Sequence, residues 1–157
     1  MKLNRKGFTL VEMLAVVIIL GILATIMVPT ITAVIEKNKE DNLDNLKKSI
    51  ISAAKVYISD HRYDITLSGN ACSASNNTRY ITHIGDTELT NSSQIPIQEL
   101  VNDGDLTTNK DNKILNPIDN NKSLDLGGSY VEVKYDCAKK DYVYGDSNGE
   151  PHLEWNP

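Results

Sequence analysis

The sequence has few of the residues on which catalytic, metal and cofactor sites depend. It contains two cysteines and three histidines, and none of them lies at the spacing of metal ligands. His61, His83 and His152 stand apart from one another, so no nucleophile–base pair can be assigned, and no glycine-rich phosphate loop is present. We therefore expect a chain that is not an enzyme and has no catalytic residue, bound metal or cofactor.

Grouped positive charge is scarce beyond the first seven residues. Those seven carry three of the 16 basic residues and no acid, so the remainder has 13 basic and 21 acidic side chains, a formal charge of −8. Binding to phosphate backbones needs clustered lysine and arginine. The folded part is therefore not expected to bind nucleic acid, and the lysine pairs at 47–48 and 139–140 are interpreted as solvated surface.

One long apolar run follows the basic start. From Phe8 to Val28 the only polar residues are Thr9, Glu12 and Thr25. A helix of these 21 residues, rising about 1.5 Å per residue, can cross a hydrocarbon core of roughly 30 Å. A secretory signal peptide has a shorter apolar region, whereas a signal anchor stays in the membrane. A carboxylate at this depth is costly, so we expect Glu12 to have a partner.

The segment KGFTLVEMLAVVIILGILATIMVP resembles the class III signal of type IV pilins and pseudopilins. The resemblance implies that a prepilin peptidase cuts between Gly7 and Phe8 and that the new terminus, Phe8, is N-methylated. It also implies that Glu12 pairs with the amino terminus of a neighbouring subunit and sets the register of a filament. A partner within its own helix is the alternative. Pro29 resembles the proline that kinks the helix of many pilins.

The resemblance further implies partners and a location. The chain would sit in the cytoplasmic membrane as a single-pass precursor, and pilus assembly machinery would then build it into a helical homo-oligomer at the cell surface. Such filaments serve adhesion, motility or DNA uptake. A minor pilin or a pseudopilin, of a DNA-uptake or type II secretion system, would share this N-terminus. A membrane-anchored extracellular binding module that is never processed is an alternative of another class.

The fold expected is α+β, a pilin fold in which a long N-terminal helix packs on a small antiparallel sheet. We expect a leader at 1–7, an assembly helix at 8–29 and, at 30–157, an amphipathic helix to about Asp60 followed by the globular part. Pro29 should bend or locally melt the helix near residues 26–31. Beyond it, RYITHI is expected as a strand, IPIQELVNDGDL as a short helix, and SYVEVKYD with DYVY as a hairpin.

Both cysteines, Cys72 and Cys137, lie far downstream of the apolar run. An even count beyond a membrane-targeting segment favours a disulfide formed in an oxidising exterior. Closing so long a loop would stabilise the fold by about 4 kcal/mol in the chain-entropy treatment. Two buried free thiols are the alternative.

Overall fold

The computed structural model describes residues 8–68, 71–72, 77–89 and 93–157. By its internal contacts the chain divides into two units, Met1–Glu40 and Asp41–Pro157, and each is described by itself. The expected leader at 1–7, including Gly7, lies outside the described residues. The division at residues 29 and 30 stays a prediction.

Helix α1, Leu10–Asp60, supplies all the regular structure described in the first unit. Its backbone stays α-helical through residues 26–31, so the local melting expected at Pro29 is wrong, whereas a bend there stays a prediction. A proline removes one helical donor. In the same turn the Thr30 hydroxyl donates to the Ile26 carbonyl at 3.0 Å. This side-chain bond supplements the backbone hydrogen bonds of that turn.

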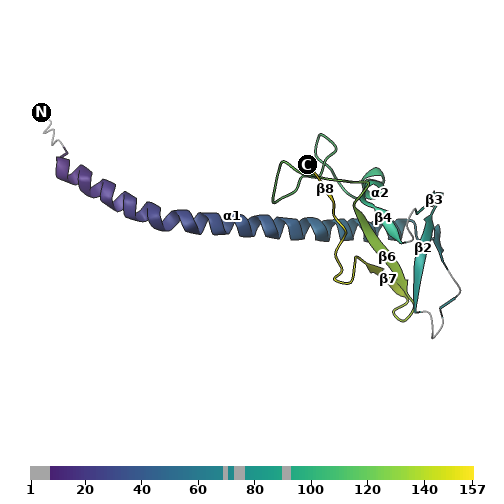
Figure 1. The fold of residues 1–157 in the computed structure, drawn as a ribbon. Helices are drawn as coiled ribbons and strands as arrows, with labels where there is room; N and C mark the ends of the chain where they lie inside the picture. The colour runs from purple at the N-terminus through teal and green to yellow at the C-terminus, as the bar shows by residue number, and fades with distance from the viewer. Residues whose placement is uncertain (1–7, 69–70, 73–76, 90–92) are drawn as a thin grey trace, which may run out of the picture. The chain divides into compact units, whose positions relative to one another are not determined.

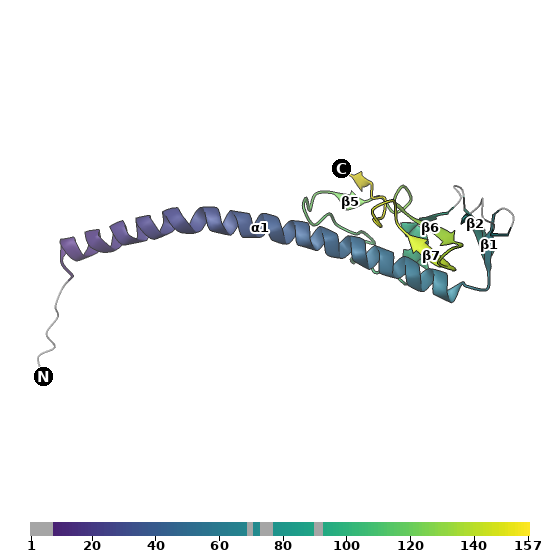
Figure 2. The same ribbon diagram turned by 90° about the horizontal axis from the view of Figure 1, so that it is seen from below.

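The second unit forms its core between the last turns of α1 and an antiparallel sheet (Figures 1 and 2). One face of α1 is buried here, because apolar residues recur at three- and four-residue steps. The buried side chains of that face are Ile50, Ala53, Ala54, Tyr57 and Ile58. The expected amphipathic helix ending at Asp60, and the α+β class, are confirmed.

The larger sheet has six strands and the order β1-β2-β6-β4, with β3 paired to β2 and β7 paired to β6. All its pairings are antiparallel. The strands are β1 Ile65–Leu67, β2 Thr78–Ile84, β3 Thr87–Glu88, β4 Gln94–Pro96, β6 Tyr130–Asp136 and β7 Asp141–Tyr144. The expected strand RYITHI is confirmed within β2, and the expected hairpin is confirmed as β6 and β7.

Strand β6 lies in the middle of this sheet. Its burial alternates, with Val131 and Val133 fully buried and their neighbours half-buried, as period-2 patterning requires. Helix α2, Ile97–Asn102, follows β4 directly, and Pro96 is its N-cap residue. Leu100 is fully buried, so one apolar side of this short helix packs in the core. The short helix expected in this segment is confirmed.

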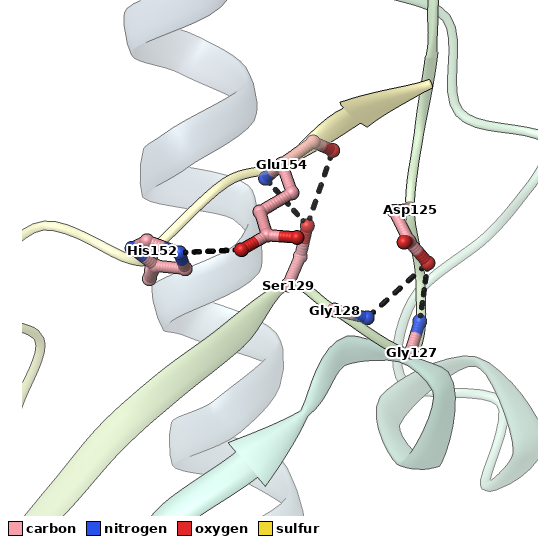
Figure 3. A network of polar contacts seen from close by, with 6 residues as sticks. All are labelled: Asp125, Gly127, Gly128, Ser129, His152 and Glu154. Atoms are coloured by element: carbon pink, nitrogen blue, oxygen red, sulfur yellow. Dashed lines mark hydrogen bonds and ion pairs between the residues drawn. The ribbon is translucent and has the colours of Figure 1, made fainter.

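The C-terminal segment is fastened by a polar network around Ser129 (Figure 3). The hydroxyl of Ser129, which is fully buried, accepts from the Glu154 backbone N–H at 2.8 Å. The Asp125 backbone N–H donates to the Glu154 carbonyl, and the Asp125 carboxylate accepts from the N–H groups of Gly127 and Gly128. These bonds adjoin a two-stranded sheet of β5, Ser123–Leu124, and β8, Trp155–Asn156.

A disulfide joins Cys72 to Cys137, with the two Cα atoms 5.7 Å apart. Cys137 follows the last residue of β6, and Cys72 lies in the segment between β1 and β2. The bridge therefore secures the end of the β6–β7 hairpin to a long polar connection. The expected disulfide is confirmed, and the free-thiol alternative is wrong.

Candidate assembly site on the N-terminal helix

The first part of α1 exposes apolar side chains around its whole circumference. Between Phe8 and Ile35 the large apolar side chains that the structure describes retain 47% to 83% of their accessible surface. A soluble monomer rarely exposes contiguous apolar surface of that extent. The helix is also long and apolar enough to span a membrane. This segment therefore requires an apolar environment that the single chain does not supply, and its length and composition suit a membrane anchor.

The start of α1 is built from two polar residues, Thr9 and Glu12. The Glu12 Oε2 atom accepts from the backbone N–H of Thr9 and from its hydroxyl, each at 2.8 Å. In return the Glu12 N–H donates to the Thr9 hydroxyl oxygen at 3.3 Å. Thr-x-x-Glu at a helix start is a capping box, in which two side chains satisfy backbone donors that the helix leaves open. Local chemistry thus explains why the helix begins at Leu10.

Glu12 therefore has a partner within its own helix, the alternative that the sequence left open. Both bonds fall on Oε2, and among the described residues no group donates to Oε1. A carboxylate offers about four acceptor positions, so the capping box leaves one oxygen available to a further donor. The pairing of Glu12 with another subunit stays a prediction.

The other predicted site residues are placed as follows. Phe8 lies immediately before the capping box, and its side chain is 77% exposed. Gly7 is outside the described residues, so the cleavage between Gly7 and Phe8 stays a prediction. Thr25, the remaining polar residue of the run, donates its hydroxyl to the Gly21 carbonyl at 2.9 Å. The helix thereby satisfies this hydroxyl without a solvent partner.

One sequence pattern with catalytic associations lies in the second unit. Residues 145–149 read G-D-S-N-G, which matches the G-x-S-x-G of hydrolase nucleophiles. That motif functions on a strand–turn–helix, but here a tight turn follows β7 and leads to the bridge between His152 and Tyr130. A Cβ at Gly145 would lie 2.3 Å from the Gly149 backbone, so that glycine serves the turn.

The acid in this turn has a structural role as well. The Asp146 carboxylate accepts from the backbone N–H groups of Asn148 at 2.8 Å and Glu150 at 3.1 Å. Hydrogen bonds from the Glu150 and then the Asn148 backbone hold the pKa of Asp146 below its usual value, because they stabilise the charged form. The pattern is therefore a hydrogen-bonded turn and not a nucleophile site.

Comparison with known families places the N-terminal segment. Residues 2–28 match the family model described as the prokaryotic N-terminal methylation motif. No curated protein and no solved structure matches the chain. The motif is the class III signal peptide of filament proteins, which are structural, and it implies processing by a prepilin peptidase and pilus-type assembly. Together with the exposed apolar helix, this motif indicates a type IV pilin-like or pseudopilin precursor.

Proposed function

We propose that this chain is a structural subunit of a type IV pilus. The peptidase cuts between Gly7 and Phe8, Phe8 is N-methylated, and the mature helix is assembled into a surface filament used for adhesion, motility or DNA uptake. The observation that carries the proposal is the geometry of Glu12. Its carboxylate is held one turn into an apolar helix, and one of its oxygens has no donor among the described residues.

The proposed cleavage creates the cation that this oxygen lacks. The new α-amino group stands at Phe8, one residue before the capping box, and methylation preserves its positive charge. A neighbouring subunit's amino terminus can then approach Glu12 Oε1 while Thr9 still occupies Oε2. An ion pair in apolar surroundings need not add stability, but only one axial offset between two helices satisfies it. The pair would therefore set the register of the filament.

Thr9 also supports the stage before assembly. A bare carboxylate in the membrane is costly, and two hydrogen bonds reduce that cost. The precursor can therefore wait in the membrane with Glu12 partly satisfied. Assembly then adds a charged partner to a carboxylate that is already oriented.

Mass spectrometry of the mature chain, expressed with its peptidase, tests the processing step. We expect Phe8 as the first residue, with a mass increase of one methyl group. A chain that retains Met1, or that starts beyond Val28, would contradict the proposal and favour an unprocessed anchor or a secretory signal peptide.

Two matched substitutions test the assembly step. Glu12→Gln keeps a side-chain acceptor for the capping box but removes the charge, so we expect normal insertion and cleavage with a large loss of sheared filaments. Glu36→Gln removes one acid from an exposed position of α1 and should leave filament yield unchanged. Equal yields from both variants would contradict the role of Glu12. The share of this chain in wild-type filaments separates a major subunit from a minor one.

A further inference from the structure

A small cavity in the second unit gathers cations and tyrosines. It has a volume of about 270 Å³ and lies between the end of α1, the turn after it and the β6–β7 hairpin. Its lining includes two cations, Arg62 and Lys140, one acid, Asp141, and three tyrosines at positions 135, 142 and 144. We propose that this cavity binds an acidic sugar ring of a polysaccharide. The inference does not depend on filament formation.

The two cations have no acidic partner among the described residues. The two other lysines of the β6–β7 hairpin form ion pairs: Lys139 pairs with Asp136, and Lys134 pairs with Glu132. Arg62 and Lys140 form no ion pair or hydrogen bond in the described part of the chain, although acids outnumber bases 21 to 16. Arginine presents a planar fork that matches a carboxylate or phosphate. The one acid of the lining, Asp141, accepts from the Tyr142 backbone N–H and forms no ion pair with either cation among the described residues, so the two cations leave the cavity with a net positive charge that can hold an anion.

The tyrosines supply neutral hydrogen-bonding groups beside these cations. Burial raises the pKa of Tyr142, and burial raises the pKa of Tyr144 to about 12. A tyrosine hydroxyl is already protonated at neutral pH, and these shifts keep both hydroxyls neutral beside the cations, where they can donate or accept. A sugar ring carries several hydroxyl groups, which such side chains can bind while the cations hold its acidic group.

The arrangement of the rings favours a sugar over a nucleobase. Tyr135 and Tyr142 meet edge-on, with centroids 5.4 Å apart, and both are half-buried. Base stacking on single-stranded nucleic acid needs an accessible aromatic face and an extended basic groove. The edge-on pair is not a stacking platform for successive bases, and the cavity is slightly below the lower limit of about 300 Å³ for a drug-sized ligand. It can hold one ring at a time.

Lys140 has an unusual backbone for a residue with a long side chain. Its φ angle is +55°, in the left-handed region, where a side chain costs roughly 1–2 kcal/mol relative to glycine. The residue closes the turn between β6 and β7, and the Asp136 carboxylate caps that turn through the N–H groups of Ala138 and Lys139. This turn geometry favours glycine, so having lysine at position 140 lowers the stability of the turn. A role of its side chain in ligand binding would explain why lysine occupies this position.

The Lys140→Gly substitution therefore removes the cation while relieving backbone strain. Binding can be measured by calorimetry on the full chain in detergent micelles, with an oligogalacturonate as the carboxylated probe. We expect Lys140→Gly and Arg62→Gln each to weaken binding about tenfold or more. The thermal midpoint of Lys140→Gly should be unchanged or higher, so that lost binding cannot be assigned to unfolding.

Three controls decide the outcome. Lys48→Gln removes one positive charge from α1 outside this cavity and should leave binding unchanged at constant ionic strength. The methyl-esterified oligosaccharide, which has lost the charge, should not bind. Equal weakening by Lys48→Gln, equal binding of the ester, or tighter binding of an oligothymidylate than of the oligogalacturonate would each overturn the proposal. None of these results depends on whether the chain forms filaments.

Discussion

The two ends of α1 carry similar apolar residues, but the first end exposes them and the last end buries them. Ile18 is 55% exposed, whereas Ile50 is fully buried against the sheet. Around Ile18 the neighbours are apolar on every side of the helix, while around Ile50 lysine and aspartate occupy the opposite face. The comparison teaches that helix formation is common to both regions, and that the arrangement of polar residues decides whether the chain itself provides the burial.

The two regions also depend on different sources of stability. The second unit owes its stability to packing and cross-linking within one chain, which unfolding experiments measure. The first region owes its placement to an external apolar medium, which partition and assembly experiments measure. A substitution should therefore affect one type of measurement and not the other.

Removing the disulfide should have the largest effect. We expect the double variant Cys72→Ser, Cys137→Ser to lose about 4 kcal/mol of unfolding free energy, because the bridge spans 65 residues of sequence. Urea titration followed by the fluorescence of Trp155, the single tryptophan, reports the change in the second unit. Retention of the variant in carbonate-washed membranes should match that of wild type. Release of the variant from the membrane would contradict the idea that the two regions are stabilised independently.

Identical truncations at the two isoleucines give the most direct comparison. Ile50→Ala should cost about 3 kcal/mol of unfolding free energy, since it opens a cavity in a packed core. Ile18→Ala should change that quantity by less than about 0.5 kcal/mol. Chemical denaturation of both variants in the same micelles tests this. Comparable losses at the two positions would show that residues near Ile18 contribute to the folded core.

Alkaline pH should have a smaller effect, again confined to the second unit, which contains all seven tyrosines. The native pKa of Tyr144 is about 12, raised chiefly by burial, against about 10 when unfolded. The native state thus favours the protonated form, so stability is unaffected below pH 10 and falls between pH 10 and 12. Because the ring is half exposed, we expect a loss of about 1 kcal/mol.

The Tyr144→Phe variant isolates that contribution. Its unfolding free energy should fall less steeply between pH 10 and 12 than that of wild type, although Tyr57 and Tyr142, whose pKa values are also raised, keep part of the slope. Parallel pH profiles for the two proteins would mean that Tyr144 titrates no differently in the native and unfolded states.

Patterned elements could be predicted from sequence. The helix ending at Asp60 follows from apolar spacing, and β6 follows from the alternation around Val131 and Val133. The methylation motif was recognisable because it is a local pattern of about 30 residues. The letters Thr9 to Glu12 contain its capping box, but an acid within an apolar run indicates only a charge that needs a partner, so the sequence leaves open whether that partner lies in the same helix.

Elements that depend on distant contacts could not be predicted. Strands β5 and β8 have two residues each, and pairing across the chain defines them. The same holds for Ser93, which is fully buried and links β2 to β6 by donating to the Ile81 carbonyl and accepting from the Val133 N–H. The cation–tyrosine cavity likewise joins Arg62 to residues about 80 positions later, so composition alone assigned Lys140 to solvated surface.

The internal hydrogen bonds of the apolar run have a consequence for movement between media. Thr9, Glu12 and Thr25 each have a partner within residues 9–25, so these bonds do not have to be exchanged when the surroundings change, although one Glu12 oxygen stays open. Apart from the open oxygen of Glu12, the free energy of moving the helix from lipid to protein surroundings is then set mainly by differences in packing, which are small between two hydrocarbon-like media. A segment of this kind has nearly equal partition into either phase, and little work would be needed to draw it from one into the other.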